Sequence, residues 1–204
     1  MNTYSTLKVS IASWLAQSNI TASDSIVDDF IDMAEAEVNR RLRVRFMESA
    51  LSLTATSATV GLPADYMGFR AVHIEGTDRY SLEYRTPEQL NSIGSDSQQP
   101  QYYTVRGEYM VFPADPSSTI TVAGTYYAKP TALSVSNETN WITTNFPQVY
   151  LFAALKNAAI YGSDDEAIGK YSALLDKALS EIEAADDGER YGPAPVMRSE
   201  TWKW

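Results

Sequence analysis

The spacing of hydrophobic positions changes twice along the chain. Near the N-terminus they recur every three or four residues, which predicts helices over about 5–17 and 24–42. From about 49 to 133, apolar and aromatic residues alternate with polar ones, as is typical of strands. The helical spacing then returns and continues to about residue 185. The pattern therefore predicts helices at both ends of the chain and a β segment between them.

The two N-terminal helices each have one apolar face. In the first helix this face consists of Leu7, Ile11, Trp14 and Leu15. In the second it consists of Ile26, Phe30, Met33, Ala34, Val38 and Leu42. We expect Glu35 and Glu37 on an exposed flank of the second helix.

Basic residues gather where the second helix ends, after an acidic first half. They are Arg40, Arg41, Arg43 and Arg45. This order suits the helix dipole and needs no ligand. A contact with phosphate or with an acidic protein surface is the open alternative for this cluster.

The most apolar helix is predicted after Pro147, which suits a first helical position because proline lacks an N–H. Between residues 148 and 161 only Gln148, Lys156 and Asn157 are polar. A helix coated so completely must be covered on more than one side. With a lysine inside it, the run is too short and too charged to span a bilayer.

A sharp turn is predicted after this helix. Gly162 is expected to end it, and the S-x-x-E sequence from Ser163 to Glu166 is expected to cap the next helix. That last helix, predicted over about 164–185, has one apolar stripe. The stripe consists of Ile168, Tyr171, Leu174, Leu175, Ala178, Leu179 and Ile182.

The β segment contains several alternating runs. In one of them Val72 and Ile74 are expected on one face of a strand, and Ala71, His73 and Glu75 on the other. Residues 101–113 predict a hairpin with Gly107 in its turn, and 119–130 predict a further strand. A short helix is expected over 87–93.

Composition narrows the class of protein. The 204 residues give a formal net charge of −10, which disfavours binding of nucleic acid through charge alone. The chain contains no cysteine, so disulfides, thiolate nucleophiles and cysteine-ligated metals are excluded. The N-terminus is a poor secretory signal.

Recognisable catalytic arrangements are missing from the sequence. His73 is the only histidine and alternates with apolar residues in a predicted strand, which favours a structural role. No phosphate-binding glycine loop and no G-x-S-x-G motif occurs. The acidic cluster Asp164 to Glu166 lacks the pattern of a calcium loop and suits a helix start. We therefore predict no catalytic, cofactor-binding or metal-binding residue and no cofactor.

Several motifs follow one another in a characteristic order. A Leu-Pro-x-Asp-Tyr turn leads into a strand within 62–76, and a hairpin follows within 100–116. Leu133–Ser134, Asn140–Trp141–Ile142 and Pro147 to Tyr150 then precede an alanine-rich helix. In this order and spacing, over about residues 20–190, the chain resembles the head-to-tail adaptor (connector) proteins of tailed bacteriophages.

The resemblance implies a virion structural protein at the head–tail interface, assembled in the host cytoplasm. It implies a homo-oligomeric ring, expected to be a dodecamer, that lies below the portal protein and carries tail or nozzle proteins. Genomic DNA would pass through the ring without specific binding, and no membrane is involved.

Two sets of residues are candidates for contacts in such an assembly. The C-terminal arm would dock on the portal, although packing back on its own subunit stays an alternative. Its candidate residues are Tyr191, Pro193, Pro195, Met197, Trp202 and Trp204. The candidates for contacts between subunits are Tyr150, Phe152, Arg40, Arg41, Arg43 and Arg45.

Together these observations predict an α+β fold. Residues 1–46 and 136–190 would form an antiparallel helical bundle, 47–135 an inserted antiparallel β domain, and 191–204 an extended arm. Two other functions stay open: a peptidoglycan-degrading virion enzyme that uses two carboxylates, and a soluble binding module with a tyrosine-rich β surface.

Overall fold

A computed structural model describes residues 2–15, 20–76, 78–93 and 99–191. It confirms the α+β fold class. The chain divides into two compact units. Met1–Arg45 with Thr131–Trp204 form a helical unit, and Phe46–Pro130 form a β unit.

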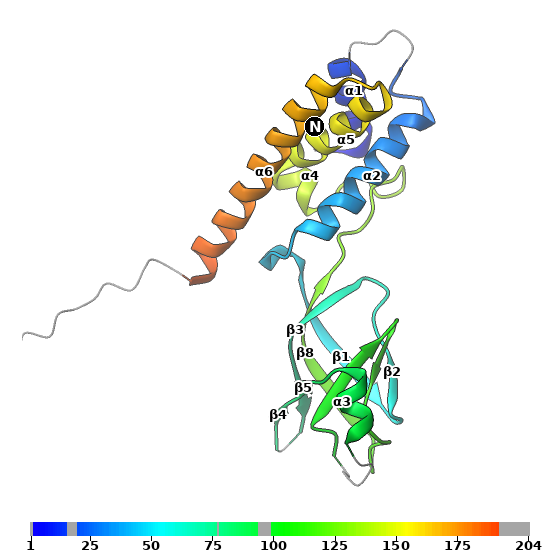
Figure 1. The fold of residues 1–204 in the computed structure, drawn as a ribbon, viewed down its shortest axis with the longest axis vertical. Helices are drawn as coiled ribbons and strands as arrows, with labels where there is room; N and C mark the ends of the chain where they lie inside the picture. The colour runs from blue at the N-terminus through cyan, green and yellow to red at the C-terminus, as the bar shows by residue number, and fades with distance from the viewer. Residues whose placement is uncertain (1, 16–19, 77, 94–98, 192–204) are drawn as a thin grey trace, which may run out of the picture. The chain divides into compact units, whose positions relative to one another are not determined.

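The helical unit is built around one central helix (Figure 1). Its elements are α1 (Tyr4–Leu15), α2 (Ser25–Arg41), α4 (Trp141–Asn145), α5 (Pro147–Tyr161) and α6 (Asp165–Tyr191). Helix α5 packs against all four others. Its apolar coat is therefore covered within the single chain, and among its residues only Ile160 and Tyr161 are exposed. Pro147 is the first residue of α5, as predicted.

The buried face of α2 differs from the predicted one. The buried residues are Val27, Phe30, Ile31, Ala34, Glu35, Val38 and Asn39. Met33 is 48% exposed, and Ile26 is only half-buried. Glu35 was expected on an exposed flank, but it is buried and accepts a hydrogen bond from the Leu133 backbone N–H at 2.9 Å. Helix α2 packs against α5, and this packing decides which of its apolar residues are buried.

Helices α1 and α2 are joined by a polar cluster. The Tyr4 hydroxyl donates to Asp28 at 2.6 Å, and the Lys8 ammonium lies 2.5 Å from the same carboxylate. Burial by itself would raise the pKa of Asp28, but the hydrogen bonds from Lys8 and Tyr4 outweigh it and lower the pKa below its ordinary value of 3.8. The cluster therefore favours the folded state while Asp28 is charged.

This cluster predicts a pH-dependent contribution to stability. A carboxylate with a lowered pKa stabilises the folded state at pH values above its pKa in the unfolded chain. This stabilisation is lost as the pH falls through its pKa in the folded chain. We expect Asp28→Asn to lower the free energy of unfolding at pH 7, and the difference from the natural chain to shrink below about pH 3.8. Urea unfolding at pH 7 and pH 3 measures this. Asp32→Asn, at an exposed position of the same helix, is the control, and an equal loss at both pH values would contradict the prediction.

The turn from α5 to α6 uses different residues from those predicted. Gly162 ends α5 with ordinary right-handed dihedral angles (φ −78°, ψ −3°), and Ser163 takes the left-handed conformation instead (φ 55°). Asp164, not Ser163, caps α6, because its carboxylate accepts a hydrogen bond from the Ala167 N–H at 3.0 Å. The predicted capping box at Ser163 is therefore wrong. Both residues are polar cap formers, and only the backbone geometry chooses between them.

Ser163 gives a second test. Glycine adopts positive φ without steric cost, so Ser163→Gly is expected to stabilise the protein by about 0.5–1 kcal/mol. Thermal unfolding measures the change. The control is Ser180→Gly, which lies inside α6 and should lower the stability instead. A loss of stability in Ser163→Gly would mean that the left-handed turn is not formed.

The β unit contains two four-stranded sheets. Their orders are β1-β8-β3-β4 and β2-β7-β6-β5. The bounds are β1 (Glu48–Ala55), β2 (Thr59–Gly61), β3 (Tyr66–Glu75), β4 (Tyr80–Ser81), β5 (Glu83–Tyr84), β6 (Tyr102–Arg106), β7 (Tyr109–Val111) and β8 (Ile120–Ala128). A short helix, α3 (Pro87–Ser92), and a 3-10 turn, η1 (Arg45–Met47), complete the elements. The predicted hairpin at Gly107 is confirmed as β6–β7.

One pair of strands departs from the predicted antiparallel pattern. β5 pairs with β6 in parallel, and helix α3 lies between these two strands in the sequence. The core draws side chains from both sheets: Val72 and Ile74, which were predicted to share one face, and also Met110, Phe112 and Val122.

Candidate interaction surfaces

The motif residue Asn140 connects three segments of the helical unit. Its side-chain oxygen accepts hydrogen bonds from the N–H groups of Ile142 (3.1 Å) and Thr143 (3.0 Å), which caps α4. Its amide nitrogen donates to the Thr131 carbonyl and to the Tyr150 hydroxyl, both at 3.1 Å. The Asn-Trp-Ile and Pro-x-x-Tyr motifs thus meet in one hydrogen-bonded unit.

Tyr150 lies inside this unit. Burial, with the nearby Glu35 carboxylate, raises the pKa of its hydroxyl well above the usual range, although the hydrogen bond from Asn140 opposes this. Its side chain is only 1% exposed in the single chain. The assignment of Tyr150 to contacts between subunits is therefore corrected. Tyr150 is a core residue of the single chain and offers no surface to a neighbour. Nothing in the sequence distinguished a buried tyrosine from an interfacial one.

Phe152 remains partly accessible. It is half-buried and lies edge-on to Trp14 of α1, with 6.3 Å between ring centroids. Trp14 is 51% exposed, so the two rings form an apolar edge where α1 meets α5. The sequence had assigned Trp14 to the buried face of the first helix. The structure places it at the border of that face.

The four candidate arginines have different surroundings. Arg43 donates to the carbonyls of Asn39 and Leu42 and so satisfies the end of α2. Arg41 pairs with Asp176 of α6 at 2.6 Å. The backbone N–H of Arg45 donates to the buried Asp186 at 2.8 Å. Arg40 is exposed and forms no ion pair with another described residue. Arg41 and Arg43 thus act within the chain, and the sequence alone could not separate them from Arg40.

The predicted C-terminal arm begins at the last residue of α6. Tyr191 is the last residue of α6, which runs further than the predicted end near residue 185. Pro193, Pro195, Met197, Trp202 and Trp204 lie outside the described residues.

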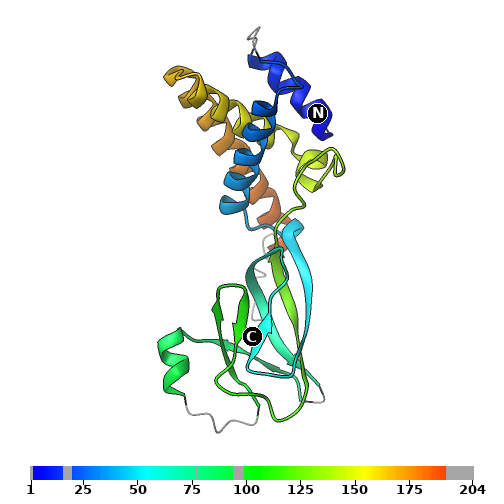
Figure 2. The same ribbon diagram turned by 90° about the vertical axis from the view of Figure 1, so that its right-hand side faces the viewer.

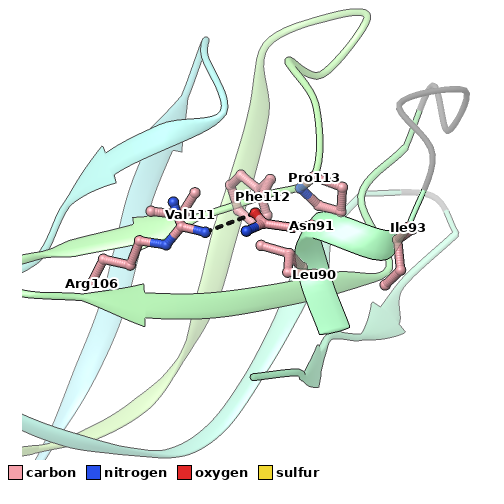
Figure 3. A pocket seen from close by; sticks show the side chains of 7 residues that line it. All are labelled: Leu90, Asn91, Ile93, Arg106, Val111, Phe112 and Pro113. Atoms are coloured by element: carbon pink, nitrogen blue, oxygen red, sulfur yellow. Dashed lines mark hydrogen bonds between the residues drawn. The ribbon is translucent and has the colours of Figure 1, made fainter. Parts of the chain in front are cut away.

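The β unit has a hollow beside α3 (Figure 3). Its volume is about 600 Å³, and it is lined by Leu90, Asn91, Ile93, Arg106, Val111, Phe112 and Pro113. Leu90 and Phe112 form an apolar floor. At the rim, Arg106 donates to the Asn91 side-chain oxygen at 3.0 Å. A single arginine that is already bound to an amide oxygen does not define a substrate for this hollow.

Four of the eight tyrosines of the β unit form one aromatic series with Phe69. Tyr66 contacts Phe69 and Tyr126, and Tyr103 contacts Phe69 and Tyr84. Burial raises the pKa of the Tyr66 hydroxyl to about 12. The series is a packed seam of the unit rather than an open stacking platform. Of its members, Tyr84 is the exposed one, at 55%.

Several ionisable groups that the sequence offered as candidates serve structural contacts. Glu37 pairs with Lys156 of α5, Asp164 caps α6, and Glu35 binds a backbone N–H. His73 is half-buried in β3. Within the ranges that the structure describes, no group of three or more His, Cys, Asp or Glu residues could hold a metal ion. The same ranges include no helix that is long and apolar enough to cross a membrane.

The motif residues Asn140 and Tyr150 thus hold the chain's own helical framework together. The sequence model of the SU10 adaptor protein family matches residues 2–199, and the chain belongs to this family. The resemblance to phage head-to-tail adaptors is thereby confirmed: this is a bacteriophage adaptor protein. A search among curated proteins found no match.

Proposed function

We propose that this chain is the subunit of a homo-oligomeric ring, of dodecameric symmetry, that joins the portal of the capsid to the tail. Membership of the adaptor family over residues 2–199 carries the proposal. The ring would sit at the head–tail interface of the virion after assembly in the host cytoplasm. It would continue the channel through which DNA leaves the capsid.

The charge of the chain is consistent with a DNA channel. A net charge of −10 repels phosphates, so DNA would pass without being held.

The proposal is tested by assembly. The full chain, alone and mixed with the portal protein of the same phage, should form rings visible in negative-stain electron microscopy and countable by native mass spectrometry. A chain that stays monomeric at high concentration, both alone and with the portal, would overturn the proposal.

We also propose that the arm, residues 192–204, docks on the portal. Its two tryptophans are the reason, since exposed tryptophan is uncommon on proteins that do not use it. Deleting 192–204 should weaken attachment to the portal at least about tenfold, the equivalent of about 1.4 kcal/mol, while leaving the melting temperature unchanged. Pull-down and calorimetry measure the two effects. A sharp fall in melting temperature would show that the arm packs on its own subunit.

A further inference from the structure

Helix α2 has an outer face that no other described element covers. Asp29, Met33, Ala36 and Arg40 follow one another at spacings of four, three and four residues, which places them on one side of the helix. All four are exposed, and Met33 is 48% exposed although it is a large apolar residue. Asp29 and Arg40 form no ion pair with another described residue.

Helix α6 has an outer face with the same spacing. Lys170, Leu174, Lys177 and Glu181 are also four, three and four residues apart. Leu174 is half-buried, and the other three are exposed. Lys170 has no carboxylate partner among the described residues, and Lys177 and Glu181 are joined only loosely, at 3.9 Å.

The two helices run in the same direction. Helix α5 runs opposite to α2, because Lys156 meets Glu37 while the later residue Tyr161 meets the earlier Phe30. The tight turn after α5 then reverses the chain into α6. Two contacts agree with this parallel order, because the later residue of one pair meets the later residue of the other: Arg41 pairs with Asp176, and the Arg45 N–H binds Asp186.

The two outer faces cannot meet within one chain. Both helices pack on α5, which lies between them in Figure 1, and Figure 2 shows α2 in front of α6 when the unit is turned. Each face looks away from the core. A contact between them therefore requires two copies, and it joins different surfaces of each copy, which is the kind of contact that builds a ring.

Laid side by side in parallel, the faces match in chemistry. Asp29 comes opposite Lys170, Met33 opposite Leu174, and Arg40 opposite Glu181. Along α2 an acidic residue comes first and a basic one last, and along α6 the order is reversed. Each charge therefore faces its opposite, and an apolar pair lies between the two charge pairs. The short side chain of Ala36 faces Lys177 and lets the helices approach.

We propose that neighbouring subunits associate through these faces, with α2 of one copy packed in parallel on α6 of the next. This rests on the proposed ring, whose contacts it assigns. The occupant of each face is a second copy of the same chain.

Disulfide cross-linking tests the register, and the chain suits it because it has no cysteine. A disulfide requires Cα atoms about 4.4–6.8 Å apart, so only a close match forms. Met33→Cys combined with Leu174→Cys in one chain should give a ladder of covalent oligomers on oxidation. An equimolar mixture of the two single variants should give dimers, and either variant alone should give none. Val9→Cys with Leu174→Cys is the matched control, because Val9 is 59% exposed but lies on α1.

The outcomes separate the interface from the ring. If the natural chain assembles but the 33–174 pair does not cross-link, the interface is overturned and the ring stands. Dimers of Met33→Cys alone would mean a symmetric contact, which also overturns it. If the natural chain never assembles, with or without the portal, the proposed function itself fails.

Charge reversal provides an independent test. Asp29→Lys with Arg40→Glu should raise the apparent dissociation constant for self-association about tenfold or more, measured by sedimentation velocity on chains with unchanged circular dichroism. Adding Lys170→Asp and Glu181→Lys to the same chain should restore association to within about threefold, which corresponds to about 0.7 kcal/mol. Failure of the four-residue variant to recover, while each reversed pair weakens assembly, would overturn the pairing.

Discussion

Replacing Gly124 with alanine is expected to cost about 3 kcal/mol or more of stability, one of the largest single-residue effects in this protein. Gly124 lies in β8, between β1 and β3 in the sheet. A Cβ atom at this position would lie 2.0 Å from the Ala71 carbonyl oxygen. That neighbour is backbone in β3, where the pairing with β8 shifts register, so it cannot move aside without breaking the strand pairing.

The matched control is Gly68→Ala in β3. A Cβ atom there would meet nothing within 4 Å, so the change should be neutral or slightly stabilising. Thermal unfolding followed by circular dichroism compares the two variants. Equal melting temperatures for Gly124→Ala and the natural chain would show that β3 and β8 do not approach as closely as described.

Replacing Asn140 with alanine is the second large expected effect, at about 2–4 kcal/mol of lost stability, the sum of a lost cap and of unsatisfied buried partners. The change leaves the N–H groups of Ile142 and Thr143 without their acceptor. It also removes the donor to the hydroxyl of Tyr150, whose side chain is buried. Urea unfolding at neutral pH gives the loss directly.

Two companion variants divide this loss. Asn140→Asp keeps the capping oxygen but loses the amide donor, so it should fall between the natural chain and Asn140→Ala. Asn145→Ala removes a hydrogen bond from an exposed side chain to the Trp141 carbonyl and should cost less than about 1 kcal/mol. If Asn145→Ala proved as costly as Asn140→Ala, the special role given to Asn140 would be wrong.

These two residues show why family motifs need not mark binding sites. Asn140 and Tyr150 contributed to the resemblance with phage adaptors, and both serve the internal framework of α4 and α5. The surfaces proposed for assembly lie elsewhere, on residues such as Asp29 and Lys170 whose spacing is ordinary for any exposed helix. A single sequence cannot distinguish such a face from a merely solvated one, because both consist of charged residues at helical spacing.

The sequence by itself determined the four long helices, the β character of the middle segment, where the β6–β7 hairpin turns, and that Pro147 begins the central helix, but it did not predict the short helix α4. These features depend on residues within a few positions of one another, so local spacing and turn chemistry are sufficient to predict them. Net charge and the lack of cysteine are likewise properties of the sequence alone.

Only the tertiary structure decided which face of α2 is buried, why Glu35 is inside, and why position 124 is glycine. Each depends on a partner far away in the chain: α2 packs on α5 and α1 with Val27 and Ile31 buried and Met33 exposed, the Leu133 N–H meets Glu35, and β3 passes close to β8. Periodicity shows that a helix has an apolar side, but two adjacent stripes can satisfy it equally well. The choice is made by packing, and packing is set by contacts between residues distant in sequence.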